Sequence, residues 1–319
     1  MAKYRTRLPQ LSEKLFLTDA GMETCLIFHE GIELPYFASF DLMKNEDGIA
    51  QARRYYERFI MMARKSGLGF VLESPTWRAN ADWAVKLGYD RAALAAINRR
   101  TIALMAQMRD QHETAESSIV ISANIGPRGD GYSPDRIMSV NEAQDYHAEQ
   151  VGVFAATDAD MVSAFTLNYV NEAIGVARAA RAANMPVVIS FTVETDGRLP
   201  TGQTLKDAIV ETDLKTNAAP AYYMLNCAHP THFADVLATD EPWVRRLRGL
   251  RANASTRSHA ELDAAPDLDA GDPVMLGQQY RDLRRRLPQL TILGGCCGTD
   301  HRHVEQICFA CTEEERKVA

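Results

Sequence analysis

The chain has 319 residues, of which 46% are hydrophobic and 24% are charged, close to the averages of globular proteins. This composition excludes a disordered chain, a collagen-like chain and a coiled coil as descriptions of the whole protein. Its 35 basic and 42 acidic residues give a net charge of −7, so the chain has no overall attraction to nucleic acid or to an anionic membrane. The composition therefore favours chemistry on small molecules.

The start of the chain and its cysteines indicate the compartment. Residues 1–14 are polar and lack the apolar stretch of a signal peptide, and no apolar run reaches the roughly 18 residues of a membrane span. We therefore expect a cytoplasmic protein without a membrane partner, and its oligomeric state is open, a homo-oligomer included. Its six cysteines would be reduced in that compartment, so we interpret them as metal ligands, nucleophiles or buried small side chains and not as disulfides.

Short apolar segments alternate with helical patterns along the whole chain. Most of these segments are rich in apolar or β-branched residues and are bounded by Gly, Pro or Asn, as strands buried on both faces are. The predicted strands cover residues 15–19, 69–73, 119–124, 161–165, 187–191, 221–225, 249–253 and 291–293. Ser139 with Glu142 and Thr204 with Asp207 mark helix starts between them. Eight β/α units predict an α/β fold, a (β/α)8 TIM barrel that forms a single domain over residues 1–319.

Polar and thiol side chains follow the predicted strands. In a TIM barrel the active site lies at the C-terminal ends of the strands. The residues at these positions are Asp19, Glu73, Asn124, Thr166, Thr192, Glu194, Asn226, Cys227, Asn253, Cys296 and Cys297. Strands commonly give way to polar loops, but that tendency does not explain why three cysteines lie at one rim. The cysteines therefore define the candidate site.

These three cysteines have the surroundings of metal ligands. Cys227 follows Asn226, and Cys296 and Cys297 lie in the sequence Gly-Gly-Cys-Cys-Gly-Thr. Adjacent cysteines are poor disulfide partners for each other, whereas the flanking glycines let both sulfurs face one point. Three converging thiolates suit Zn²⁺ and leave its fourth position open, as in catalytic zinc sites. A substrate thiol bound there would be deprotonated and could attack a methyl group carried on a positively charged sulfur or nitrogen.

Four short motifs are spread over essentially the whole chain. They are Asp19-Ala20-Gly21-Met22, Asn124-Ile125-Gly126-Pro127, Asn226-Cys227 and Gly294-Gly295-Cys296-Cys297-Gly298-Thr299. Together they resemble the motifs of the zinc-dependent homocysteine S-methyltransferases, which include betaine-homocysteine and S-methylmethionine-homocysteine methyltransferases. The resemblance implies an eight-stranded barrel, a catalytic Zn²⁺ on Cys227, Cys296 and Cys297, and methyl transfer to homocysteine giving methionine, a step of methionine biosynthesis.

The resemblance also implies where the amino acid binds. The loop formed by Asp19, Ala20 and Gly21 is expected to help hold it. We add Asn226 and Thr192, which follow the sixth and fifth predicted strands, to the expected substrate-binding residues.

The chain departs from the family where the amino group of homocysteine binds. The family commonly has a Glu just after the fourth strand, and this chain has Phe165 there; the Glu of the first loop is also displaced. A buried ammonium group still needs a carboxylate, because an unpaired buried charge costs several kcal/mol. We expect Glu73 to take that role, with Glu23 and Glu194 as the other candidates.

Other side chains are interpreted from their type and position. Trp77, Phe165 and Tyr169 could form walls for a cationic methyl donor, since aromatic faces attract such groups. Cys308 and Cys311 lie a turn apart in a predicted final helix and are expected to pack in its interior face. The histidines near the cysteine motifs, which could support the metal ligands, are His229, His301 and His303.

Alternative functions share parts of this site. We expect an onium donor such as S-methylmethionine, S-adenosylmethionine or betaine, with another methylated onium compound and a methylated folate also open. The acceptor could be a thiol other than homocysteine. A non-catalytic zinc-binding or thiol-binding protein would use the same cysteines. A zinc hydrolase is disfavoured, because hydrolytic zinc usually has His or carboxylate ligands.

Overall fold

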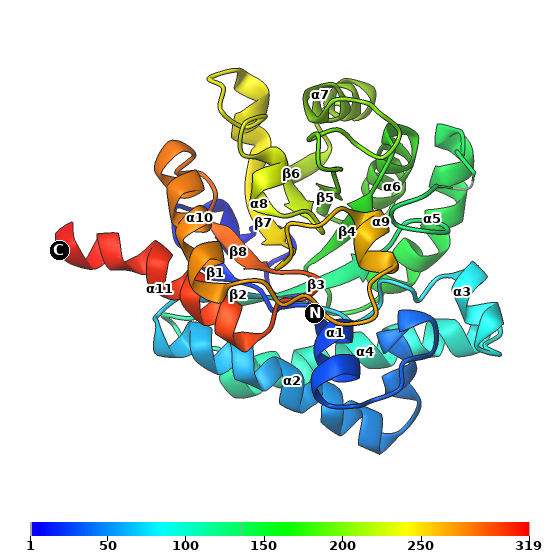
Figure 1. Ribbon diagram of the computed structural model, residues 1–319. Helices are drawn as coiled ribbons and strands as arrows, with labels where there is room; N and C mark the ends of the chain where they lie inside the picture. Colours follow the sequence, from blue (N-terminus) through cyan, green and yellow to red (C-terminus); the bar gives the residue numbers. More distant parts are fainter. Residues whose placement is uncertain (1, 135, 319) are drawn as a thin grey trace.

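The computed structural model describes residues 2–134 and 136–318, with side chains described as far as residue 312 in the last helix, and Figure 1 shows their arrangement. Eight parallel strands form a closed barrel in which each strand pairs with the next and β8 pairs with β1. The strands are β1 (Phe16–Leu17), β2 (Gly69–Glu73), β3 (Ile119–Ile125), β4 (Met161–Leu167), β5 (Val187–Phe191), β6 (Pro220–Asn226), β7 (Leu247–Ala252) and β8 (Ile292–Gly295). The predicted TIM barrel is confirmed.

Most of the helices surround this barrel on its outer face, and two short ones, in the segments after β1 and β7, lie at its C-terminal end (Figure 1). The helices are α1 (Met22–Thr24), α2 (Glu46–Lys65), α3 (Ala81–Lys86), α4 (Arg91–His112), α5 (Val140–Ala155), α6 (Val170–Ala182), α7 (Leu205–Thr216), α8 (Pro230–Phe233), α9 (His259–Asp263), α10 (Pro273–Arg286) and α11 (His301–Val318). Both predicted helix starts are confirmed: Ser139 and Glu142 form a capping box on α5, and the Thr204 side chain accepts from Asp207 N at the start of α7. No helix in the described part of the chain is both long and apolar enough to cross a membrane.

The predicted strands agree with the structure to within two residues at each end, and β2 and β5 agree at both ends. The main difference is in β4, which continues to Leu167. Its pairing with β5 shifts between Ala164 and Leu167, where Thr166 has a φ of 61°. Residues other than glycine rarely adopt this left-handed backbone conformation, so its presence indicates a local constraint. An apolar sequence pattern does not predict that a strand resumes its pairing after such an irregularity.

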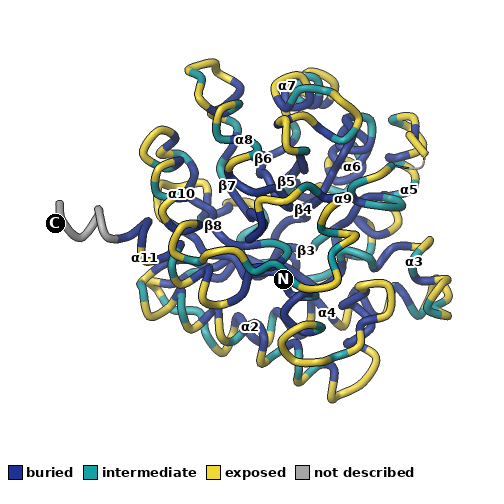
Figure 2. Tube along the Cα trace, in the orientation of Figure 1, coloured by how far each residue is buried: buried dark blue, intermediate teal, exposed yellow. Residues whose placement is uncertain are grey.

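The barrel interior changes from apolar to polar along the strands. Its apolar cluster contains Leu8, Phe16, Val71, Val120, Met161, Phe165, Val188, Tyr222, Met224 and Ile292. Because side chains alternate between the two faces of a strand, the next inward positions in β2, β6 and β7 are Glu73, Asn226 and Arg251. The strands are dark blue in Figure 2, which shows that the helices and loops bury their outer face as well. Polar groups are thus concentrated at the C-terminal end of the barrel.

The loop after β1 contacts the loop after β8 at Gly21. A Cβ atom at this position would overlap the carbonyl oxygen of Cys296 and lie 2.5 Å from Thr24 Oγ1. The Gly21 N–H also donates to the carbonyl oxygen of Thr299 at 3.3 Å. This close approach places the loop that begins at Asp19 beside the cysteine pair.

We predict that Gly21→Ala destabilises the protein by about 1–3 kcal/mol, because the added methyl group forces one of these loops to shift. Gly152→Ala in α5 is the matched control, since a Cβ there meets nothing within 4 Å. The control is expected to be neutral or to stabilise by up to about 1 kcal/mol through helix propensity. Urea unfolding measures both free energies, and equal stability of the two variants would contradict the close contact.

Candidate active site

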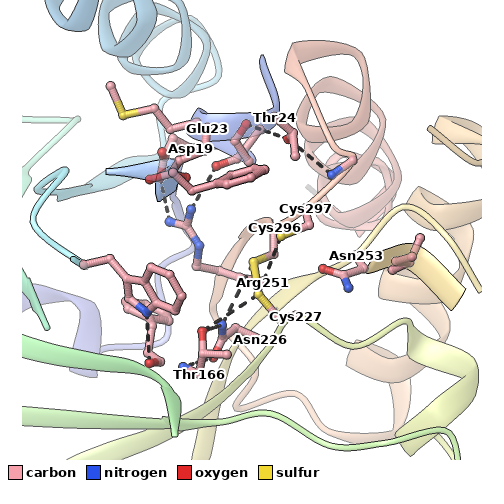
Figure 3. A pocket seen from close by; sticks show the side chains of 18 of the residues that line it. Asp19, Glu23, Thr24, Thr166, Asn226, Cys227, Arg251, Asn253, Cys296 and Cys297 are labelled. Carbon is pink, nitrogen blue, oxygen red and sulfur yellow. Dashed lines mark hydrogen bonds and ion pairs between the residues drawn. A yellow bond between two sulfur atoms is a disulfide. The ribbon is translucent and has the colours of Figure 1, made fainter. Parts of the chain in front are cut away.

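The three cysteines predicted as metal ligands come together at the C-terminal end of the barrel. Cys227 follows β6, and Cys296 and Cys297 follow β8. Their Sγ atoms lie within 4.8 Å of one another, and the Sγ atoms of Cys227 and Cys297 are 4.0 Å apart. Figure 3 shows the sulfurs gathered at one point of the pocket. The donor set, three thiols and no carboxylate, is one that suits Zn²⁺.

Cys227 and Cys296 are paired as a disulfide in this structure, whereas the sequence analysis expected reduced cysteines (Figure 3). Their side chains aim at the same point, and their Cα atoms are 5.5 Å apart, within the usual range for a disulfide. The two thiols are therefore close enough to bond when oxidised. Since the thiolate is the form that binds a metal, this disulfide and a three-cysteine metal site exclude each other.

Asn226 fixes the turn that carries Cys227. Its Oδ1 accepts from Thr166 N at 2.9 Å and from Ser190 Oγ at 2.6 Å, and its Nδ2 donates to Thr166 Oγ1 at 2.8 Å. These bonds join the ends of β4, β5 and β6. Cys227 has a φ of 54°, so the turn is held in a conformation that is unfavourable for a residue with a side chain. Asn226 borders the cavity, but its hydrogen bonds serve the cysteine loop.

Thr192, the other expected substrate contact beyond the first loop, also serves this turn. Its hydroxyl donates to the Cys227 carbonyl oxygen at 3.4 Å, and it does not line the cavity.

Two residues that the sequence analysis missed, Tyr132 and His259, cover the cysteines. The Tyr132 hydroxyl lies 3.7 Å from Cys297 Sγ, and its ring stacks on the imidazole of His259 with centroids 4.1 Å apart. The two ring nitrogens of His259 face oxygen acceptors, the Cys227 carbonyl and Oε1 of Glu194. Glu194, an ammonium candidate in the sequence, is thus engaged with a histidine.

The histidines near the cysteine motifs lie elsewhere. His229 caps α8 through its contacts with Thr231, His303 bonds to Asp300 and to the Ala270 carbonyl, and His301 is exposed. None of the three lines the cavity. Burial lowers the pKa of His229 to about 4, so it is neutral at physiological pH. These histidines therefore serve the local structure.

Arg251 of β7 forms the floor of the site with Asp19. Its Nη1 donates to Asp19 Oδ1 at 2.6 Å and to Thr18 Oγ1 at 2.9 Å, and its Nη2 donates to the Ala20 carbonyl at 3.0 Å (Figure 3). The other carboxylate oxygen of Asp19 accepts from the Tyr55 hydroxyl at 3.0 Å. Burial alone would lower the pKa of Arg251, but the nearby carboxylates raise it above its usual value. Arg251 is therefore charged, and Asp19 is committed to protein partners.

Glu73 is the unpartnered carboxyl group of the site. Its side chain ends inside the barrel at 3% exposure, and neither oxygen has a hydrogen-bond partner among the described residues. Burial raises the pKa of Glu73 to about 8, although the charge of Arg251 opposes the shift. The group is therefore largely protonated at neutral pH in the free protein.

A cavity of about 320 Å³ opens next to the cysteines, Arg251 and Glu73. Trp77 and Phe165 form part of its wall, and Trp77 Nε1 donates to the Phe165 carbonyl at 3.2 Å. Each ring already contacts an arginine: Arg78 lies 4.8 Å from the Trp77 ring, and Arg251 lies 5.4 Å from the Phe165 ring. The carboxylate side chains that line the cavity are Asp19, Glu23, Glu73, Asp130, Asp263, Asp267 and Asp269.

Three other expected residues fall outside this cavity. Tyr169 does not line it, because its hydroxyl turns away and accepts from Met138 N at 3.4 Å. Cys308 and Cys311 are buried in α11, in agreement with the predicted packing role. Glu23 does line the cavity, where its carboxylate accepts from the Ser39 hydroxyl at 2.6 Å.

Comparison with known proteins shows the family and the fold of the chain. A family model described as homocysteine S-methyltransferase matches residues 16–311. The chain is similar in structure to the homocysteine methyltransferase MmuM from Escherichia coli in its oxidised form, at 18% identity and a TM-score of 0.72, covering 96% of this chain and 99% of that chain. The chain is also similar to the metallated form of MmuM, at 16% identity and a TM-score of 0.70, covering 95% of this chain and 98% of that chain. At these identities the structural likeness shows a shared fold, and the family model adds the assignment. The chain belongs to the homocysteine S-methyltransferase family and is a methyltransferase.

Proposed function

We propose that the protein transfers a methyl group from a cationic onium donor to the thiol of homocysteine, giving methionine, with Zn²⁺ held by Cys227, Cys296 and Cys297. The observation that carries this proposal is the convergence of three thiol sulfurs within 4.8 Å at the edge of a cavity of about 320 Å³. Family membership supports homocysteine as the acceptor. The zinc assignment rests on the sulfur-only donor set.

The cysteines have the chemistry that such a site requires. When bound to the reduced cysteines, Zn²⁺ would lower the pKa of an acceptor thiol, so that the sulfur is a thiolate at neutral pH. Asn226 and Thr192 hold the Cys227 turn through the hydrogen bonds described above. Tyr132 and His259 cover the same sulfurs from the loops after β3 and β7. The chain thus orients the thiols and restricts the access of water to them.

Glu73 is the residue best placed to bind the ammonium group of homocysteine. The other carboxylates considered for this role have partners: Asp19 bonds to Arg251 and Tyr55, and Glu23 accepts from Ser39. Glu194 faces His259 and does not line the cavity. Glu73 has no partner among the described residues, and an ammonium group would supply one. A cation beside it favours the ionised form, so Glu73 would lose its proton as the amino acid binds.

The charge of the cavity favours an onium donor. Seven carboxylate side chains and two arginines line it, so it attracts S-methylmethionine, S-adenosylmethionine or betaine more than an anionic methylated folate. The Trp77 and Phe165 rings each already face an arginine, which leaves the carboxylates as the main source of attraction for the donor cation.

The transfer itself balances without a proton relay. The thiolate sulfur forms a bond to the methyl carbon as the bond between that carbon and the onium sulfur or nitrogen breaks, and the electron pair stays on the leaving atom. The negative thiolate and the positive donor become a neutral thioether and an uncharged leaving group. Apolar walls such as Phe165 favour this loss of charge, because separated charges are costly in a medium of low polarity.

Replacing any one of the three cysteines is predicted to remove bound zinc. Protein purified under reducing conditions is expected to hold about one Zn²⁺ per chain, and Cys227→Ala, Cys296→Ala and Cys297→Ala are expected to hold little. Cys308→Ala is the matched control, because Cys308 is buried in α11 away from the cavity. Metal analysis measures the zinc content, and circular dichroism checks folding. Full zinc content in a folded Cys297→Ala protein would contradict the ligand set.

Glu73→Gln is predicted to change the number of protons released when homocysteine binds the zinc-loaded, reduced protein. At pH 7 a group with a pKa of about 8 is roughly nine-tenths protonated, so wild type should release about two protons, one from the thiol and nearly one from Glu73. Arg251 and Asp19 are the charged groups whose electrostatic influence reaches Glu73, the first favouring its ionised form and the second opposing it. Glu73→Gln should release about one proton and bind about 10- to 150-fold more weakly.

Calorimetry in two buffers of different ionisation enthalpy counts these protons. Glu194→Gln, which alters a carboxylate held by His259, is the matched control and should release as many protons as wild type. Binding of 4-mercaptobutyrate, which lacks the amino group, should release about one proton from wild type. Equal proton release by Glu73→Gln and wild type would show that Glu73 does not receive the ammonium group.

The donor assignment predicts which compounds give methionine. With homocysteine as acceptor, at least one of S-methylmethionine, S-adenosylmethionine and betaine should yield methionine by mass detection, whereas 5-methyltetrahydrofolate should yield none. The rate at low donor concentration should fall as salt is added, because salt screens the attraction between the carboxylates and the donor. Methylation by the folate alone would contradict the proposed donor class.

A further inference from the structure

Arg251 reaches the floor of the cavity because of its place in the barrel. β7 lies between β6 and β8, so Arg251 is the neighbour in register of Asn226 on one side and of Gly294 on the other. Gly294 has no side chain, and a Cβ there would overlap Thr18 Oγ1. The long Arg251 side chain therefore crosses β8 above this glycine and reaches β1, where it meets Asp19.

The protein uses only part of the hydrogen-bonding capacity of Arg251. A guanidinium group has five N–H donors in a planar fork. The contacts with Thr18, Asp19 and the Ala20 carbonyl account for both hydrogens of Nη1 and one of Nη2. The second Nη2 hydrogen and the Nε hydrogen have no hydrogen-bond partner in the described part of the chain, and Arg251 lines the cavity. A fixed, charged donor pair is thus available to a ligand.

The environment of Arg251 suits an anionic ligand group. The guanidinium carbon of Arg251 lies 5.4 Å from the centroid of the Phe165 ring. A carboxylate at that position would compete for the unused N–H groups, and a phenyl ring does not. Glu73, the other acidic group at the floor, is largely protonated in the free protein. Arg251 is therefore a cation whose one direct ion pair among the described residues is with Asp19.

We propose that Arg251 binds the carboxylate of the thiol acceptor and selects thiols that carry one. The proposal rests on the proposed transfer to a thiol held at Cys227, Cys296 and Cys297, and it does not depend on the role of Glu73. Arginine binds carboxylates through two parallel N–H···O bonds, which fixes the orientation of the ligand as well as its charge. The carboxylate would bind to Arg251 on β7, and the sulfur would bind at the cysteines that follow β6 and β8. Neighbouring strands would thus hold both ends of the acceptor.

A pair of thiols that differ only in charge tests this assignment. 4-Mercaptobutyrate and its neutral amide, 4-mercaptobutyramide, have the same chain length, and neither has an amino group that could reach Glu73. Calorimetric binding to the reduced, zinc-loaded wild-type protein should favour the carboxylate by about 10- to 150-fold. Equal affinity for the two thiols would overturn the role of Arg251 and leave the proposed transfer intact. Failure to bind any thiol, homocysteine included, would overturn the proposed function and this inference with it.

Variants separate ligand binding from structural support. Arg251→Lys keeps the charge beside Asp19 but loses the planar fork, so it should bind the carboxylate at least about 10-fold more weakly and the amide unchanged. Arg78→Lys, which changes the other arginine of the cavity, is the matched control and should keep the wild-type ratio of the two affinities. If Arg251 had a purely structural role, Arg251→Lys would weaken the binding of both thiols equally. Equal weakening of the two thiols, which leaves the ratio of their affinities unchanged, would contradict the proposal. If the variant does not fold, the comparison of the two thiols on the wild-type protein tests the proposal by itself.

Discussion

The buried ion pair between Arg251 and Asp19 joins β7 to β1 across β8, where the barrel closes. Removing one partner of such a pair leaves an uncompensated buried charge, which typically costs about 3–5 kcal/mol. The pair also sets the site, because Asp19 begins the loop whose Gly21 packs on the carbonyl of Cys296. The cysteine pair and the cavity floor are therefore linked through this ion pair, and at position 294 of the strand between them a Cβ would overlap Thr18 Oγ1.

Charge at the cavity floor changes with its occupant. In the free protein Arg251 and Asp19 balance each other, and Glu73, with a pKa raised to about 8 by burial, is largely protonated. A zwitterionic amino acid brings one charge of each sign, which this floor can match with one carboxylate and one guanidinium. The remaining carboxylates lie around the cavity and give it an acidic character. Under the proposed function, charge would distinguish the two substrates: the acceptor would bind at the floor, and the carboxylates of the lining would attract a cationic donor.

The alternation of short apolar segments with helical patterns predicted the barrel well, because strands that are buried on both faces appear in the sequence as apolar runs bounded by turn residues. The cysteines could be found because flanking glycines and their place after two strands indicate a shared point. Arg251 was missed, although a lone arginine in the middle of a predicted buried strand was a usable signal. Tyr132 and His259 gave no such signal, since they lie in the segments after β3 and β7, which meet only in the folded chain. The sequence likewise could not show that Asp19 and Thr192 bond to the protein itself, or that Cys227 and Cys296 lie close enough to pair.

The central claim is that an acceptor thiol joins the three cysteine sulfurs on one zinc ion. X-ray absorption at the zinc edge tests it directly, using the reduced, zinc-loaded protein with and without saturating homocysteine. The account predicts that the first shell gains one sulfur neighbour at about 2.3 Å when homocysteine is added, giving four sulfurs in all. A first shell that stays unchanged under saturating homocysteine would contradict it.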